Sequence, residues 1–398
     1  MIMETMSSKE RIIRTLEGKP VDRVPSMSAM MEAKTIYEFR KKPFMSRFIS
    51  DEKLLKMPLS KFVLDRWAPS LTKLIFRPSL TKVFHLRNTG QIEMGFDAIW
   101  AYYDDTWIML DSKSYAMPTG SIYNLFPDGS GNMSYMYSKP GITTPEEFDA
   151  WPYWPDTDEM AHRVYKYYKK FVADYGEKVC ITACGSSLGL QEGMNCTFGI
   201  DKVPIWIKRH PAYVSRYLDL HEEIKMKTSE ALIGAGVPVI FISDDFCFKT
   251  GPFLNPKIID SVFGPYYRRI FKYIRDRGVK VILHSCGDNT KIFDIFLSWG
   301  IDALHAYETT SDVDIFKQKE LHGDRVTMIG GMGIDYLLTA KSKDEEVVAR
   351  VKELIKRLGP GGRFIVAPTN SVDSMSAHKL QVMLDVVKKY GSYPININ

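Results

Sequence analysis

The chain has 398 residues, 45% of them hydrophobic and 25% charged, which is the composition of an ordinary globular protein with a large core. Its 53 basic and 48 acidic residues leave a net charge of only +5 without runs of like charge, so we expect no nucleic-acid partner. Five cysteines are too few for a disulfide framework, and neither a signal peptide nor an apolar run that could span a membrane is recognisable, which together predict a cytoplasmic protein.

The first predicted element is a helix. Ser7 and Glu10 have the spacing of a capping box, and Ile12 and Leu16 then lie on one helical face. Gly18-Lys19-Pro20 ends this helix. The region that follows, residues 25–95, is helix-rich but its elements cannot be ordered from the sequence.

From residue 96 onward, short β-rich apolar runs alternate with longer amphipathic stretches, which is typical of β-α units in a parallel sheet. The expected strands are Phe96–Tyr103, Val179–Cys184, Val237–Ser243, Val279–His284, Ala303–Tyr307, Val326–Ile329 and Phe364–Ala367. An eighth strand is expected within residues 25–95. Eight such units favour a (β/α)8 TIM barrel over an open doubly wound sheet.

The predicted organisation is a single structural unit with two parts. Residues 1–90 form an N-terminal helical extension, and residues 91–398 form the catalytic barrel. Residues 115–157 contain many Gly, Pro, Ser and Tyr residues and predict a long inserted segment near the barrel mouth, such as a hairpin or lid. No G-x-G-x-x-G motif follows an early strand, which argues against a dinucleotide-binding fold.

The ends of two neighbouring strands predict a metal site, because catalytic groups in such barrels follow the C-terminal ends of the strands. His284 and Cys286 are two residues apart and point the same way in an extended segment. Glu308 ends the next strand and would lie beside them. An imidazole, a thiolate and a carboxylate suit a zinc ion and leave a fourth position open for substrate. The alternative is a buried His with a structural Cys, and a Glu that caps a helix.

Other polar and aromatic residues predict the rest of the site. Asp244 and Asp245 follow another strand and would orient the substrate or relay a proton, unless they cap the next helix or bond within the barrel. Aromatic residues and methionines concentrate before residue 140, where they either pack in the core or form a wall for a flat apolar ligand. The predicted substrate-binding residues are Tyr102, Tyr103, Trp107 and Asn370.

Two segments resemble the uroporphyrinogen decarboxylase superfamily. One is Glu10-Arg11 followed by Leu16–Pro25, and the other is Asp244-Asp245-Phe246 followed by Gly251–Pro256 and then Pro265-Tyr266. The superfamily includes decarboxylases, methyltransferases that act with corrinoid proteins and, more distantly, cobalamin-independent methionine synthase. The resemblance implies that His284 and Cys286 match the His-x-Cys zinc ligands of the methyltransferases, and that Glu308 matches a Glu of the methionine synthase group.

Two departures from the family pattern narrow the function. Decarboxylases carry an Arg-rich motif after the N-terminal helix, whereas Pro25–Glu32 contains no arginine, so a clamp for tetrapyrrole carboxylates is missing. Thiol-methylating relatives have a further zinc-ligating Cys after the last strand, whereas Ala367–Asn370 has none. The implied zinc ligands are therefore His284, Cys286 and Glu308, with Cys247 as a reserve ligand that would replace or join Glu308.

The resemblance and the altered ligand set predict a zinc-dependent methyltransferase of the O-demethylase branch. It would move a methyl group from a methoxylated, aromatic substrate to the Co(I) of a corrinoid. The D-x-H-x-x-G loop of corrinoid carriers is missing from the sequence, so the corrinoid is expected on a separate protein. The sequence is also compatible with a homodimer. The alternatives are methyl transfer from a methylcorrinoid protein to a thiol such as coenzyme M, a uroporphyrinogen decarboxylase-like enzyme, and a metal-free binding protein.

Overall fold

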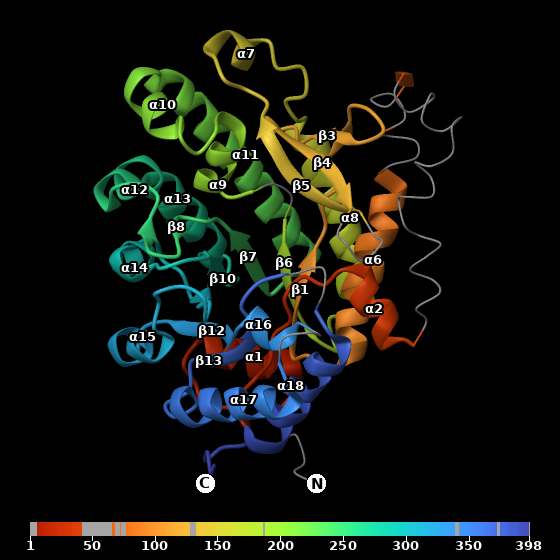
Figure 1. The fold of residues 1–398 in the computed structure, drawn as a ribbon, viewed down its shortest axis with the longest axis vertical. Helices are drawn as coiled ribbons and strands as arrows, with labels where there is room; N and C mark the ends of the chain where they lie inside the picture. The colour runs from red at the N-terminus through yellow and green to blue at the C-terminus, as the bar shows by residue number, and fades with distance from the viewer. Residues whose placement is uncertain are drawn as a thin grey trace.

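A ring of parallel strands forms the centre of the molecule (Figure 1). The computed structural model describes residues 6–41, 66–67, 72, 77–127, 133–185, 188–338, 342–371 and 375–397. Residues 42–65 and 73–76 of the predicted N-terminal extension lie outside this part of the chain. Seven strands are hydrogen-bonded in chain order: β1 (Ala98–Tyr102), β6 (Cys180–Cys184), β7 (Val239–Ser243), β10 (Lys280–His284), β11 (Ala303–Ala306), β12 (Thr327–Met332) and β13 (Phe364–Pro368).

A short segment near the N-terminus joins the two edge strands of this sheet. Ser26 forms a parallel bridge with Val366 of β13, and Met27 forms one with Ala98 of β1. The Met27 N–H donates to the Val366 carbonyl at 2.9 Å, and the Ser28 N–H donates to the Ala98 carbonyl at 3.0 Å. This pairing supplies the eighth position of the predicted (β/α)8 barrel. It comes from the stretch that the sequence analysis assigned to the N-terminal extension.

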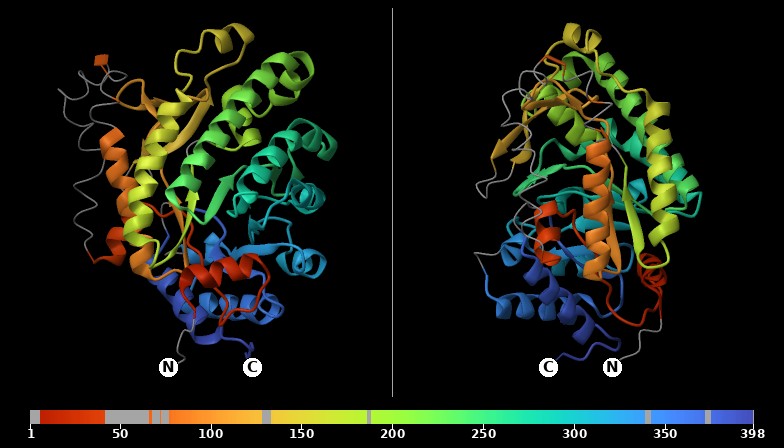
Figure 2. Two further views of the ribbon diagram at one scale, coloured as in Figure 1. Left: turned by 180° about the vertical axis from the view of Figure 1, so that it is seen from behind. Right: turned by 90° about the vertical axis from the view of Figure 1, so that its right-hand side faces the viewer.

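Helices cover the outside of the barrel, and α8 and α11 run side by side there (Figure 2). Pro265 explains why α12 (Pro256–Val262) and α13 (Gly264–Arg275) are separate helices, since proline cannot donate a backbone hydrogen bond within a continuous helix. No helix in the described part of the chain has both the length and the apolar character needed to cross a membrane. The helices are α1 (Ser8–Leu16), α2 (Ala33–Phe39), α6 (Arg77–Met94), α7 (Pro145–Asp149), α8 (Thr157–Tyr175), α9 (Leu190–Phe198), α10 (Val203–Arg209), α11 (Pro211–Ala235), α12 (Pro256–Val262), α13 (Gly264–Arg275), α14 (Phe293–Trp299), α15 (Ile315–His322), α16 (Ile334–Leu337), α17 (Asp344–Leu358) and α18 (Ala377–Tyr390).

The long insertion between β1 and β6 contains a second, antiparallel sheet. Its strands are β2 (Ile108–Met109), β3 (Ser114–Ala116), β4 (Ser121–Pro127) and β5 (Met133–Pro140). Strands β4 and β5 contact α9, and Figure 1 shows this sheet beyond the C-terminal ends of β1 and β6. A small hairpin of β8 (Cys247–Phe248) and β9 (Gly251–Pro252) follows β7. The insertion therefore lies near the barrel mouth, as the sequence predicts.

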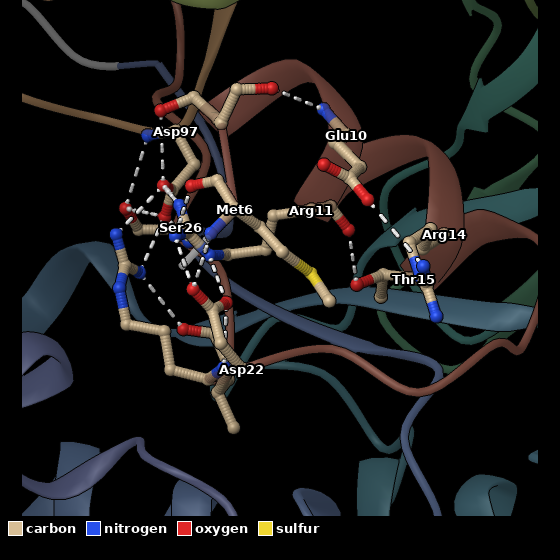
Figure 3. A network of polar contacts seen from close by, with 12 residues as sticks. Met6, Glu10, Arg11, Arg14, Thr15, Asp22, Ser26 and Asp97 are labelled. Atoms are coloured by element: carbon tan, nitrogen blue, oxygen red, sulfur yellow. Dashed lines mark hydrogen bonds and ion pairs between the residues drawn. The ribbon is translucent and has the colours of Figure 1, made fainter. Parts of the chain in front are cut away.

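A buried network of charges joins the N-terminal motif to the start of β1 (Figure 3). The Asp97 carboxylate lies 2.6 Å from Nη1 of Arg11 and 2.7 Å from Nη1 of Arg23, and it accepts the Ser26 N–H at 2.9 Å. Nε of Arg11 also lies 2.6 Å from a carboxylate oxygen of Asp22. The charged residues of the family-like segment thus hold helix α1 and the eighth strand against the N-terminal end of the barrel.

A buried histidine on α11 predicts how stability depends on pH. Both ring nitrogens of His221 are buried without a hydrogen-bond partner among the described residues. Burial, helped by nearby Lys225, lowers the pKa of His221 to about 3, whereas an unfolded histidine titrates near about 6.5. Between these values the unfolded state binds more protons, so stability decreases as pH falls through that window.

His221→Phe should therefore reduce the loss of stability in acid. The ring of Tyr217 lies 4.2 Å from the His221 ring, so a phenyl ring can occupy the same place. We expect the free energy of unfolding in urea, measured from pH 7 to pH 4, to fall less steeply in the variant, by up to about 1.4 kcal/mol per pH unit. Parallel pH profiles for the two proteins would show that His221 does not control this behaviour.

Candidate metal centre at the barrel mouth

Two adjacent strands bring three potential ligands together at their C-terminal ends. His284 is paired in register with Ser243, so Cys286 and Asp245 each lie two residues beyond that pair. The Cys286 N–H donates to Oδ1 of Asp245 at 2.8 Å and ties the two turns to each other. The turn needs glycine at position 287, where φ is 81° and a Cβ atom would lie 2.4 Å from the Phe248 carbonyl oxygen.

The ligand atoms of Asp245, His284 and Cys286 lie within 4.8 Å of one another. Nε2 of His284 is 3.2 Å from Sγ of Cys286 and 3.8 Å from Oδ1 of Asp245. Nitrogen, sulfur and carboxylate oxygen are the usual zinc ligands, and three protein ligands with an open fourth position are typical of catalytic zinc. The structure thus brings together the predicted pair His284 and Cys286, but the carboxylate in the group belongs to Asp245.

Glu308 lies next to this group and is connected to it through Asn370. Nδ2 of Asn370 donates to Sγ of Cys286 at 3.2 Å and to Oε1 of Glu308 at 3.1 Å. Tyr307, directly before Glu308, has a left-handed backbone with φ of 63°. This conformation ends the strand alternation before Glu308. The placement of Glu308 beside Cys286 agrees with the sequence analysis, whereas its membership in the three-residue group does not.

Burial favours the neutral forms of the Cys286 and His284 side chains. The pKa of the Cys286 thiol lies well above its usual value, first because of burial and then because of the negative charges of Asp245 and Glu308. Burial lowers the pKa of His284 to about 4. Since a thiolate is the form that binds zinc, a divalent cation would reverse the unfavourable electrostatics of this cluster. The donor set therefore fits a zinc ion.

A second histidine, His305, contacts the Nδ1 side of His284. Nδ1 of His305, on β11, lies 2.5 Å from Nδ1 of His284, and Nε2 of His305 lies 2.9 Å from the Pro368 carbonyl oxygen. The two imidazoles pack against the rings of Trp100 and Phe241 inside the barrel. The sequence analysis did not assign a role to His305, although its position in the strand that ends at Glu308 placed it next to the metal-binding strand.

A cavity of about 490 Å³ adjoins the cluster, and both Asp245 and Glu192 line it. Oε2 of Glu192 is buried and has no hydrogen-bond partner among the described residues. Burial, followed by the charges of Asp245 and Asp244, raises the pKa of Glu192 well above its usual value. The sequence analysis missed Glu192 because it considered only residues that end the strands, whereas Glu192 lies in the first turn of α9.

Comparison with known proteins gives the family of this barrel. A family model described as "Uroporphyrinogen decarboxylase (URO-D)" matches residues 130–390. The chain belongs to the uroporphyrinogen decarboxylase family. This assignment confirms the family resemblance that the sequence analysis identified from the residues around Arg11 and Asp244.

Solved structures show a similar fold for this uroporphyrinogen decarboxylase family member. A methyltransferase from Methanosarcina mazei has a TM-score of 0.63 at 15% identity, covering 97% of this chain and 99% of that chain. A D-allulose 3-epimerase from Methylomonas sp. has a TM-score of 0.42 at 12% identity, covering 79% of this chain and 92% of that chain. Among curated proteins, none is similar enough to this chain to count as a match.

Asp244 of this family member has a helix-capping position. It is fully buried and accepts the Gln191 N–H at 3.0 Å, the Glu192 N–H at 2.6 Å and the Tyr267 hydroxyl at 2.6 Å. Burial raises its pKa to about 7. The two backbone donors tie the start of α9 to Asp244, and Glu192 therefore lies beside Asp245 in the lining of the cavity. The sequence analysis had considered a cap on the helix that follows Asp244, whereas α9 precedes it in the chain. Of the two aspartates, Asp245 lines the cavity.

The predicted aromatic wall is divided between two sides of β1. The Tyr102 hydroxyl and Nε1 of Trp107 both donate to Asp104, at 3.2 and 3.1 Å. Tyr103 points the other way, because neighbouring strand residues alternate sides, and its ring stacks on Tyr167 of α8 at 4.2 Å. Tyr103 lines a separate cavity between α6 and α8. The aromatic residues that line the cavity beside Asp245 and Glu192 are Tyr137, Phe198 and Phe253.

Proposed function

We propose that this chain is a zinc-dependent methyltransferase that moves a methyl group from a methoxylated, aromatic substrate to the corrinoid of a separate protein. The observation that carries the proposal is the meeting of Asp245, His284 and Cys286 beside a cavity at the C-terminal end of the barrel. The family membership and the fold shared with the methyltransferase from Methanosarcina mazei support it.

The chemistry of a methyl ether explains why such a site is needed. An ether oxygen leaves badly because negative charge develops on it as the C–O bond breaks. A zinc ion bound by His284, Cys286 and a carboxylate would supply a Lewis acid for that oxygen. Asp245 and Asn370 hold the Cys286 region in place through its backbone N–H and its sulfur. These contacts keep the ligands together before substrate arrives.

The lining of the cavity suits a small, partly apolar substrate. Tyr137 and Phe253 supply ring surfaces, and Glu192 supplies a buried oxygen that lacks a partner. Because buried polar atoms are nearly always hydrogen-bonded, a hydroxyl group on the substrate would supply the hydrogen-bond partner that Oε2 of Glu192 lacks among the described residues. Apolar walls with a few fixed polar groups are the usual form of a small-molecule site.

Exposed apolar residues around the cavity support docking of a protein that carries the corrinoid. Tyr137 and Ile200 line the cavity and are 41% and 44% exposed. Phe248 is 54% exposed, and its ring lies 4.4 Å from that of the cavity residue Phe253. Apolar side chains that gather at the rim of a pocket are typical of an interaction surface.

The test combines the zinc-loaded protein with a reduced corrinoid protein and a panel of methoxylated aromatics, methylamines and methanol. We expect the absorbance of methylated Co(III) to appear with a methoxylated aromatic, and to disappear when zinc is removed by a chelator. Transfer from methylated corrinoid protein to a thiol, without any activity in the first assay, would overturn the proposed direction. Zinc-independent activity would overturn the proposed role of the metal.

A further inference from the structure

We infer that His305 is a positioning residue, which fixes the tautomer of His284 so that Nε2 of His284 is free to bind a metal ion. The inference deepens the proposed zinc site and rests on it. Two consecutive hydrogen bonds support it. The first joins the Pro368 carbonyl to His305, and the second joins His305 to His284.

The first step follows from the Pro368 carbonyl, which can only accept a hydrogen bond. Nε2 of His305 lies 2.9 Å from this oxygen, so Nε2 of His305 must carry the hydrogen. A neutral imidazole has one hydrogen, which leaves Nδ1 of His305 as an acceptor. His305 is fully buried, and burial away from water disfavours a charged imidazole, so the ring is neutral.

In the second step, the acceptor Nδ1 of His305 determines which nitrogen of His284 carries the hydrogen. The two Nδ1 atoms lie 2.5 Å apart, and since Nδ1 of His305 accepts, Nδ1 of His284 must donate. The lone pair of His284 is then on Nε2, which faces Sγ of Cys286 at 3.2 Å and Oδ1 of Asp245 at 3.8 Å. Neutral imidazole with a free lone pair is the form that ligates zinc.

Two aromatic rings enclose the histidine pair, and the Pro368 carbonyl distinguishes between the two orientations of the His305 ring. The ring of Trp100 lies 5.5 Å from His284 and 6.0 Å from His305, and the ring of Phe241 lies 5.9 and 5.7 Å from them. A reversed His305 ring would place a carbon atom against the Pro368 carbonyl and leave that buried oxygen without its donor, which is unfavourable. The hydrogen bond to the Pro368 carbonyl therefore favours the tautomer of His305 with its hydrogen on Nε2.

Two substitutions separate the hydrogen-bonding role of His305 from its bulk. His305→Gln keeps an acceptor oxygen and a donor NH₂ on one planar group, so it can still accept from His284 and donate to Pro368. His305→Leu keeps an apolar side chain of similar length but removes both bonds. We expect zinc affinity, measured on metal-free protein by competition with a chelator, to fall about 10–100-fold in His305→Leu and to change only a few-fold in His305→Gln. Circular dichroism and the midpoint of thermal unfolding check that both variants fold.

A measurement without metal tests the inference separately from the zinc site. Nitrogen chemical shifts of ¹⁵N-labelled imidazole in the metal-free protein should report His284 protonated at Nδ1, and His305→Leu should shift that population toward Nε2. Protonation of wild-type His284 at Nε2, or unchanged shifts and zinc affinity in His305→Leu, would overturn the role of His305. Failure of the wild-type protein to bind zinc would instead overturn the proposed metal site, whatever the tautomer.

Discussion

Replacing Cys286 by serine should remove bound zinc and lower the rate of methyl transfer about 10³-fold, because Lewis-acid stabilisation contributes several kcal/mol to such a transition state. A serine hydroxyl fits the space of the thiol and can keep the contact with Asn370, whose Nδ2 lies 3.2 Å from Sγ. Unlike a thiolate, it is a poor ligand for zinc. Elemental analysis of the purified variant and the corrinoid absorbance assay measure the two effects.

The matched control is Cys247→Ser. Cys286 follows β10, and Cys247 follows the neighbouring strand β7. Sγ of Cys247 lies 3.3 Å from Oδ1 of Asn289 and outside the three-residue group. We expect this variant to retain zinc and activity. Loss of zinc in Cys247→Ser, with zinc retained in Cys286→Ser, would show that the reserve ligand from the sequence analysis is the true one.

The second large effect concerns stability. Asp97→Asn should lower the free energy of unfolding by about 3–5 kcal/mol, the usual result of removing one partner from a buried ion pair. The Arg11 side chain is fully buried and that of Arg23 is 7% exposed, so neither guanidinium can recover its lost interaction from water. Urea unfolding of the metal-free protein measures the change.

Asp158→Asn is the matched control for Asp97→Asn. Asp158 forms an ion pair with Lys227 at 2.6 Å, but its side chain is 84% exposed. Exposed ion pairs contribute about 0–1 kcal/mol, so we expect little change. Zinc affinity should be unaffected in both variants, because Asp97 precedes β1 and lies at the opposite end of the barrel from His284. Equal destabilisation by the two substitutions would mean that the buried network is not a main support of the fold.

The barrel strands could be predicted because each is an apolar run that is buried on both faces. Strand β10 is Lys280–His284, against Val279–His284 expected from the sequence, and β13 differs by one residue at its end. The eighth strand could not be located in the same way. Its bridging residues Ser26 and Met27 are too few to form a visible apolar run, and only their hydrogen bonds to distant strands define them.

The candidate site was predictable where it depended on local geometry. His284 and Cys286 follow from the two-residue repeat of an extended chain. The same repeat places Tyr102 and Tyr103 on opposite sides of the chain, which their prediction as one aromatic wall did not take into account. The carboxylate that lies within the three-residue group is that of Asp245, whereas the sequence analysis had chosen Glu308. The position of Asp245 follows from the register between β7 and β10, and the backbone before Glu308 is left-handed at Tyr307. Neither feature can be read from the sequence.

The closure of the barrel through Ser26 and Met27 affects how the protein can be synthesised. The segment that fills the gap leaves the ribosome early, whereas Val366, one of its two partners, is added more than three hundred residues later. Until then the nascent sheet has two open edges, and contacts of such long sequence separation form slowly. The barrel can therefore close only after nearly all of its strands have been synthesised.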